Sequence, residues 1–191
     1  MQGRLIRSWY EMSEALRALY EGDREKGGRL LPPDNELSVF EAAAFGRTGR
    51  LGQILDVDPS QVADRLDGFT PLHLAVFGGS ADACRLLIRH GADVDAISDG
   101  DVIRVSPLGT ATFVRSVDLA KLLLDAGADV NACSDGGFTP LHTAAENNDL
   151  DLCRLLLERG AKPSAINSRG ELPVALAHSS SVRALLQKDQ E

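Results

Sequence analysis

Aromatic residues, cysteines and long apolar runs are scarce in this sequence of 191 residues. Aromatic residues make up only 5% of it although 43% is hydrophobic, and Leu and Ala supply most of the apolar side chains. This balance suits closely packed helices better than one large globular core. Three cysteines leave at least one thiol unpaired, which favours a reducing setting.

A membrane-spanning run and a basic surface are also missing. No apolar run approaches the roughly 18 residues that a membrane span needs, and the scattered charges of the first residues are unlike a secretory signal. The formal net charge is -8, and an acidic surface repels a phosphate backbone. We therefore expect a cytoplasmic protein that binds neither membrane nor nucleic acid.

Motifs for catalysis and metal binding are absent from the sequence as well. It has no Gly-Lys-Ser/Thr phosphate loop and no Gly-x-Ser-x-Gly nucleophile turn. The acidic cluster from Asp93 to Asp101 fails the calcium-loop pattern, because Ser98 and Arg104 stand where Gly and Glu are needed. Cys84 and Cys153 fall on apolar helix faces, where inert buried thiols are expected. We expect no catalytic residue, no metal and no cofactor.

What the sequence does contain is a tandem repeat. The stretch Gly68-Phe69-Thr70-Pro71-Leu72-His73 returns almost unchanged as Gly137-Phe138-Thr139-Pro140-Leu141-His142. The prolines that align these and two weaker copies are 36, 33 and 33 residues apart: Pro71, Pro107, Pro140 and Pro173. A second marker keeps the same register over three copies: Gly91–Ala96, Gly127–Ala132 and Gly160–Ala165.

Each repeat has the signals of two short helices. Thr70 is a good N-cap, and Pro71 suits the first helical position, where its missing N–H costs nothing. Gly79 breaks the first helix, and Gly91 ends the second with a conformation that favours glycine. Two helices of about eight residues cannot bury their apolar sides alone, so the repeats must stack on one another.

Repeats of this length, with Thr-Pro-Leu-His at the start and Gly-Ala-Asp-Val-Asn/Asp-Ala at the end, resemble ankyrin repeats. The resemblance covers about Leu37 to Leu186. It implies an all-α repeat solenoid of stacked helix-turn-helix repeats, with short β-hairpin fingers and a concave face made by the fingers and the first helices. It also implies that His73 and His142 hydrogen-bond within and between repeats. The expected repeats are 37–64, 65–97, 98–133, 134–166 and 167–191, the first and last degenerate.

Residues 1–36 lie outside this array. An apolar stripe predicts an amphipathic helix over residues 1–21, ending at Gly22. The residues of the stripe are Leu5, Trp9, Met12, Leu16 and Leu19. Gly27-Gly28 and Pro32-Pro33 then indicate a linker. The stripe either packs on the first repeat as a cap or docks on a partner or a second copy of the chain.

The third repeat departs most from the pattern. It is three residues longer, and its helix start reads Ser106-Pro107-Leu108-Gly109. The extra length predicts a longer finger, 99–105, which carries Val102, Ile103 and Val105. Insertions in repeat arrays map to the surface and often to the binding face. These side chains either contact a partner or pair across the finger and cover its neighbour.

The resemblance implies a non-catalytic module that binds a partner protein on its finger and first-helix face. The finger candidates are Phe69, Ile103, Arg104 and Phe138. The first-helix candidates are Phe77, Phe113, Arg115, Glu146 and Asn147. Each could instead be an ordinary surface or packing residue. The acidic surplus predicts a partner with a basic patch, and we expect a monomer. The alternatives are a scaffold that self-associates through the N-terminal helix, or a regulatory or accessory subunit of a separate enzyme.

Overall fold

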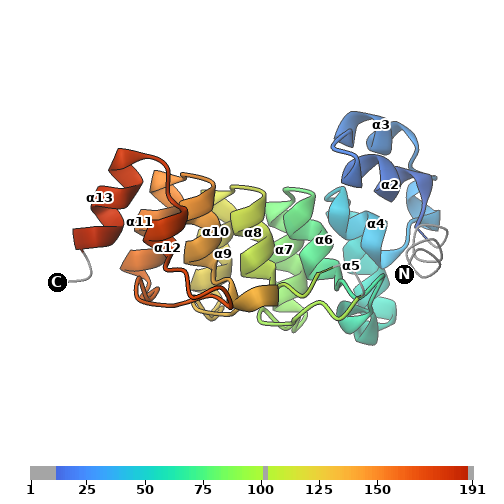
Figure 1. Ribbon diagram of the computed structural model, residues 1–191. Coiled ribbons are helices and arrows are strands. Elements are labelled where there is room, and N and C mark those ends of the chain that lie inside the picture. Colours follow the sequence, from blue (N-terminus) through green and yellow to red (C-terminus); the bar gives the residue numbers. More distant parts are fainter. Residues whose placement is uncertain (1–11, 101–102, 189–191) are drawn as a thin grey trace. The chain divides into compact units, whose positions relative to one another are not determined.

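The computed structural model describes residues 12–100 and 103–188 (Figure 1). Leu5 and Trp9 of the predicted stripe, and Asp101 and Val102 of the predicted finger, lie outside these residues. The chain divides into two compact units, which are described separately. The described part of unit 1 is residues 12–93, 98–100 and 103, and that of unit 2 is residues 94–97 and 104–188.

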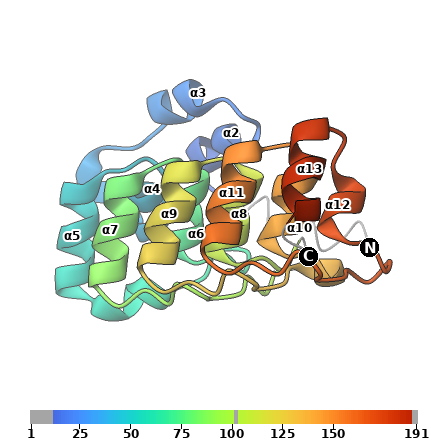
Figure 2. The same cartoon turned by 90° about the vertical axis from the view of Figure 1, so that its left-hand side faces the viewer.

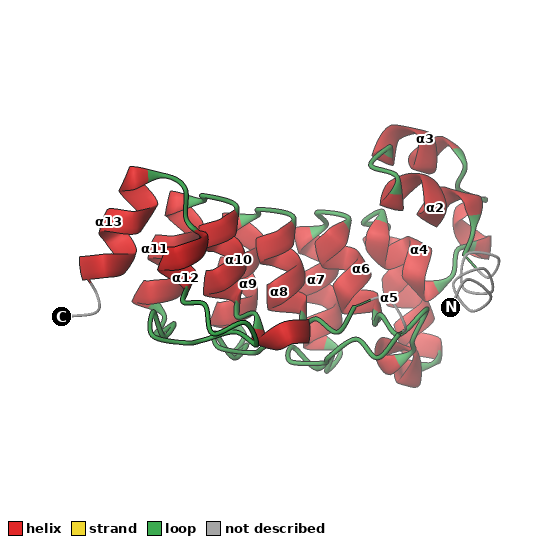
Figure 3. Cartoon of the chain, in the orientation of Figure 1, coloured by secondary structure: helices red, strands yellow, loops and turns green. Residues whose placement is uncertain are grey.

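The described residues form helices joined by short loops (Figure 3). The α-helices of unit 1 are α2 (Glu14–Tyr20), α3 (Arg24–Arg29), α4 (Val39–Ala44), α5 (Thr48–Val57), α6 (Pro71–Phe77) and α7 (Ala81–Arg89). Those of unit 2 are α8 (Pro107–Phe113), α9 (Val117–Asp125), α10 (Pro140–Glu146), α11 (Leu150–Glu158), α12 (Pro173–Leu176) and α13 (Ser180–Lys188). Short 3-10 turns lie at Asp34–Glu36, Pro59–Ala63 and Asp135–Gly137.

Within each unit the helices pair into antiparallel hairpins that stack in two layers. In unit 1, α4 packs on α6 and α5 packs on α7. In unit 2, α10 lies between α8 and α12, and α11 lies between α9 and α13 (Figure 2). The predicted all-α repeat architecture is confirmed. The first helices of the five predicted repeats are α4, α6, α8, α10 and α12.

Small and branched apolar side chains let these short helices pack closely. Leu72, Ala75 and Leu87 of the second repeat have no exposed surface, and Leu141 and Leu156 are the equivalents in the fourth. Because each helix has four to ten residues, its own hydrogen bonds stabilise it little, and burial against the next hairpin supplies most of its stability.

The turn between the two helices of a repeat needs one residue with a positive φ. Gly79 has φ 71° at this position, Arg115 has φ 58° and Asn148 has φ 54°. Glycine adopts this left-handed conformation freely, whereas arginine and asparagine adopt it at a small cost in free energy. The turn therefore keeps its shape while its side chain changes from one repeat to the next.

The predicted β-hairpin fingers are not confirmed. The part of the chain that the structure describes contains no β-strand, and the pairing of Leu66 with Phe69 is an isolated bridge. Successive fingers in unit 2 still join through the backbone, because Asp135 N donates to Arg104 O at 3.1 Å and Ser168 N donates to Gly136 O at 2.7 Å. These bonds join single residues of neighbouring fingers, and strands do not develop among the described residues.

Helices α2 and α3 belong to unit 1, whereas the sequence predicts that residues 1–36 lie outside the repeats. The glycine pair predicted to be a linker lies within α3, whose N-cap Asp23 accepts from Lys26 N at 2.8 Å. At Gly27 a Cβ atom would lie 2.7 Å from Ala15 O and 2.8 Å from the Phe45 ring. This glycine is needed for close packing and does not break the helix.

Candidate protein-interaction surface

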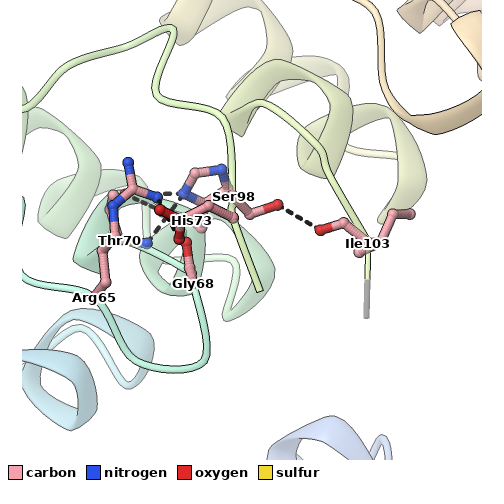
Figure 4. Close-up of polar contacts among 7 residues, drawn as sticks. Arg65, Gly68, Thr70, His73, Ser98 and Ile103 are labelled. Atoms are coloured by element: carbon pink, nitrogen blue, oxygen red, sulfur yellow. Dashed lines mark hydrogen bonds and ion pairs between the residues drawn. The ribbon is translucent and has the colours of Figure 1, made fainter. Parts of the chain in front are cut away.

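The repeated Thr-Pro-Leu-His motif builds a helix start and not a catalytic site. His73 Nδ1 accepts from Thr70 N at 3.2 Å and lies 2.8 Å from the Thr70 hydroxyl (Figure 4). The Thr70 hydroxyl in turn caps the helix by accepting from His73 N at 3.5 Å. Both side chains are buried. The structural role predicted for His73 agrees with these contacts.

His142 contacts Thr139 as His73 contacts Thr70, and its ring also bonds a residue of the next repeat. Its Nδ1 accepts from Thr139 N at 3.2 Å, and its Nε2 lies 3.1 Å from Glu171 O of the next repeat. Nε2–H is therefore the donor, and the ring is neutral. Burial lowers the pKa of His142, while the hydrogen bond to Glu171 O and the Glu171 charge act in the opposite direction. The ring joins two repeats, as the resemblance to ankyrin repeats implies.

The lengthened finger is held inside unit 1 by polar contacts (Figure 4). Arg65 donates to Gly68 O at 2.9 Å and pairs with the Asp99 carboxylate at 3.2 Å. Ser98 Oγ donates to Ile103 O at 2.7 Å. The Ile103 side chain is 41% exposed. Of the two apolar finger residues that the structure describes, Ile103 is more exposed than Val105.

Val105 explains why the third repeat lacks the histidine. Its side chain is buried, and a Cβ atom on Gly109 would lie 2.5 Å from Val105 Cγ2. Gly109 stands where Thr-Pro-Leu-His has histidine, and the valine covers this position. The Ser106 hydroxyl still caps the helix by accepting from Gly109 N at 3.1 Å. Val105 is therefore packed at the start of α8 in its own repeat.

The nine predicted contact residues divide into three groups by unit and element. Phe69, Phe77 and Ile103 lie in unit 1, Arg104 and Phe138 lie in the fingers of unit 2, and Phe113, Arg115, Glu146 and Asn147 lie where α8 and α10 end. The seven-residue helices α8 and α10 separate the last two groups, because a helix rises 1.5 Å per residue and so extends about 10 Å. The prediction from the sequence placed all nine residues on one face, made by the fingers and the first helices.

The last group forms a continuous surface in unit 2, which we call the turn edge: Phe113, Arg115, Glu146 and Asn147. Asn147 Nδ2 donates to Thr112 O at 3.5 Å and so links the two helix ends. Arg115 Nε lies 3.4 Å from an Asp149 carboxylate oxygen. Glu146 is exposed, and Phe113 is 67% exposed. The turn edge combines an exposed ring with charges of both signs.

In the fingers of unit 2, Phe138 is half-buried. The His142 ring lies 5.7 Å from it, and the Arg169 guanidinium lies over it at 5.3 Å. Arg104 is tied by its backbone, because its N–H donates to an Asp135 carboxylate oxygen at 2.9 Å, while its side chain is exposed. Phe138 therefore offers less free surface than Phe113.

In unit 1, Phe69 and Phe77 are packed under the N-terminal helices. The Tyr20 ring stacks on Phe77 with centroids 4.8 Å apart and lies 6.5 Å from Phe69. Tyr20 and Arg24 contact this face, and neither is among the residues predicted from the sequence. Tyr20 is the neighbour of Leu19 in the stripe, which gave a signal for it, whereas nothing in the sequence marked Arg24.

The thiols and the remaining polar groups give no further site. Cys84 and Cys153 are buried, and burial raises the pKa of each thiol to about 12. Cys133 is exposed. Among the described residues no group of His, Cys, Asp or Glu is arranged to hold a metal ion. None of the helices that the structure describes has the length and apolarity to cross a membrane.

Comparison with known proteins decides the family. A family model described as ankyrin repeats, three copies, matches residues 39–134 and 111–191. The chain is an ankyrin repeat protein. Ankyrin repeats are generally protein–protein interaction modules, so this coarse function applies to the chain.

Two curated proteins are similar to parts of this chain. The Zinc finger CCCH domain-containing protein 33 of Oryza sativa subsp. japonica is 37% identical over 93 residues, which are 46% of this chain and 16% of that protein. Delta-latroinsectotoxin-Lt1a of Latrodectus tredecimguttatus is 37% identical over 70 residues, or 33% of this chain and 5% of the toxin. The chain thus spans less than a fifth of either relative.

Proposed function

We propose that this ankyrin protein binds a partner protein at the turn edge of unit 2, with the Phe113 ring at the centre of the contact. The observation that carries the proposal is the 67% exposure of Phe113. At the same place in the preceding repeat, six residues after the aligned proline, Phe77 is covered by Tyr20. Aromatic rings that become buried on binding contribute much of the affinity of protein interfaces.

The surroundings of Phe113 support this assignment. Arg115, Glu146 and Asn147 place donors and acceptors beside the ring, and a polar rim around an apolar centre is typical of interfaces. Arg115 and Asn147 are already held by Asp149 and by Thr112 O. Because these side chains and the stacked helices are ordered before binding, little conformational entropy is lost on association.

Photo-crosslinking tests this proposal. A photoreactive amino acid placed at position 113 should crosslink to a partner protein in an extract of the native cell. The matched control carries the same group at Val57, which is 88% exposed at the end of α5. In addition, Phe113→Ala should lower the recovery of that partner by about tenfold or more, as expected for a central aromatic contact. Identical products from positions 113 and 57, or full recovery with Phe113→Ala, would contradict the proposal.

The remaining parts of the function are also proposals. We propose that the partner presents a basic patch, so its association rate should fall as salt is added. The three cysteines are free, which supports a reducing, cytoplasmic setting. A regulatory or accessory role for a separate enzyme is one form of partner binding. Self-association through the N-terminal stripe is not favoured, because Met12, Leu16 and Leu19 are buried in unit 1.

A further inference from the structure

We infer that unit 1 has a second protein-binding face, which α2 and α3 cover. The two helices act as an internal ligand of this face, and a segment of a partner protein can displace them. The external ligand of this face is a partner segment that presents an aromatic residue and an arginine in the arrangement of Tyr20 and Arg24. We call the face below the two helices the covered face: Phe40, Ala44, Phe45, Leu66, Phe69, Leu74 and Phe77, with the carbonyl oxygens of Ala44 and Gly78. This proposal concerns unit 1 alone and does not depend on the partner of the turn edge.

The apolar contacts place α2 across two repeats. Met12, Leu16 and Leu19 form a buried cluster with Ala44 of the first repeat and Leu74 of the second. Tyr20 extends this contact further into the second repeat by stacking on Phe77. Burial, together with the Asp67 charge, raises the pKa of the Tyr20 hydroxyl to about 12. A cap would need to cover only the first repeat. Helix α2 instead contacts both the first and the second repeat, as a bound ligand would.

Arg24 provides the polar part of the contact. Its guanidinium donates to Ala44 O at 3.1 Å and also to Gly78 O. These carbonyls lie at the C-terminal ends of α4 and α6, where the helix dipoles favour a cation. The guanidinium also lies over the Phe45 ring, 5.5 Å from its centroid. An aromatic side chain and a guanidinium are thus the two groups that the covered face recognises.

The polar contacts of the covered face do not all depend on the two helices. Ser80 Oγ donates to Ala44 O at 3.2 Å, so this carbonyl keeps a hydrogen bond when Arg24 leaves.

The packing of α2 and α3 on the covered face also includes contacts that are unfavourable in free energy. Arg17 Nε is buried without a hydrogen-bond partner among the described residues, which is unfavourable. Burial, and the nearby charge of Arg47, lower the pKa of Arg24.

The repeats of unit 2 show that such a face can remain folded while uncovered. There Phe113 occupies the position of Phe77 with two thirds of its side chain exposed, and Asn147 bonds Thr112 O as Ser80 bonds Ala44 O. The repeat fold therefore does not require a covering segment at this place. The residues after α3, with Pro32-Pro33, tether the segment to the repeats, so it can leave and return.

The competition between internal and external ligand follows from this tether. A segment held by a short tether acts at an effective concentration on the order of millimolar. An external segment with the same side chains must therefore bind tightly or be present at high concentration. A partner that supplies both an aromatic residue and an arginine replaces every contact that Tyr20 and Arg24 make, and the covered face then changes its occupant without refolding.

Hydrogen exchange of the wild-type full-length chain is the first test. If α2 and α3 open as a separate segment, their amides should exchange about 100-fold faster than those of α4 and α6, in line with local opening below the global free energy of unfolding. Equal protection of the two pairs of helices would show that they open only together. That result would overturn the proposal, because the segment would then be part of the core.

The second test uses a fluorescent peptide with the sequence of residues 12–31 as the probe. It should bind the full-length double variant Tyr20→Ala/Arg24→Ala at least about tenfold more tightly than it binds the wild type, whose own segment competes. A peptide with the same two substitutions is the control. Failure of the probe to bind the variant, or loss of amide protection in α4 and α6 of the variant, would overturn the proposal.

A third variant separates the two faces. Phe113→Ala, introduced into the double variant, should leave the affinity of the probe unchanged, because the probe binds unit 1. If the probe no longer binds, it occupies the turn edge, and the assignment to unit 1 is wrong. The crosslinking experiment at position 113 is independent of this result, so each proposal can fail without the other.

Discussion

His142 is the side chain whose removal should weaken unit 2 most clearly. The ring is buried with no exposed surface. It holds Thr139 N at 3.2 Å, the Thr139 hydroxyl at 2.8 Å and Glu171 O at 3.1 Å. Each net hydrogen bond contributes about 0.5–1.5 kcal/mol, and truncation of the ring also leaves a cavity. We therefore expect His142→Ala to lower the free energy of unfolding by about 2–4 kcal/mol.

Urea unfolding followed by circular dichroism measures this change, and hydrogen exchange assigns it to unit 2. His178→Ala is the matched control, because His178 is exposed at the end of the array. Its effect should stay within about 0.5 kcal/mol, as is usual for surface positions. Equal effects of the two substitutions would refute the argument that the His142 contacts stabilise the junction between repeats.

The same ring predicts a dependence on pH. Nδ1 can accept from Thr139 only while it carries no proton, and burial lowers the pKa of His142 below its ordinary value. The unfolded chain then takes up the proton first as the pH falls, so the free energy of unfolding decreases below about pH 6.5. The difference in stability between wild type and His142→Ala should therefore narrow from pH 7.5 to 5.5. A constant difference would show that the ring does not control the effect.

Three further predictions follow from packing and burial. Gly27→Ala should loosen α3 and lower the free energy of unfolding by about 1–3 kcal/mol, whereas Gly28→Ala, where a Cβ atom meets nothing within 4 Å, should not destabilise the chain. Gly68→Ala should destabilise unit 1 more than Gly79→Ala, because both have a positive φ but only Gly68 would place a Cβ atom against another backbone, 1.9 Å from Gly100 N; urea unfolding measures each pair. A maleimide reagent should modify Cys133 rapidly in the folded chain and the two buried thiols only after unfolding, as mass spectrometry can follow. Rapid labelling of three thiols would contradict their burial.

The helix hairpins could be predicted because their signals are local. Thr70 and Pro71 place a helix start, and Leu and Ala at helical spacing identify the buried side. These signals repeat with one period, so each copy supports the others. The strand signal had no such basis in the residues, since it came from the resemblance alone, and the described fingers form isolated pairs.

Contacts between distant parts of the chain could not be predicted in the same way. Gly27 looked like a linker residue because its packing partners, Ala15 and Phe45, are known only from the structure. Gly109 looked like a loss of the motif. The side chain that covers the position of the missing histidine belongs to Val105, which lies four residues earlier in a loop. Arg24 carried no signal, since its acceptors are backbone carbonyls, which every sequence has.

The candidate contact residues were predicted from their places in the repeat, and the structure puts them in different surroundings. Phe113 was chosen from its place in the repeat, and the structure exposes it. Phe77 was chosen by the same rule, but α2 covers it. One rule cannot separate the two, because the difference depends on what packs on each repeat and not on the repeat itself. Whether these residues bind a partner stays a prediction.

The turn between the two helices lets one side chain vary while the backbone conformation stays the same. Arg115 and Asn148 hold the left-handed conformation that Gly79 adopts without strain, and replacing either with glycine would relax the backbone at that point. The array instead keeps a charged or amide side chain there. Neighbouring repeats can thus diversify what they display, one residue at a time, while the hairpin below stays the same. The chemistry of the surface and the geometry of the scaffold can evolve separately.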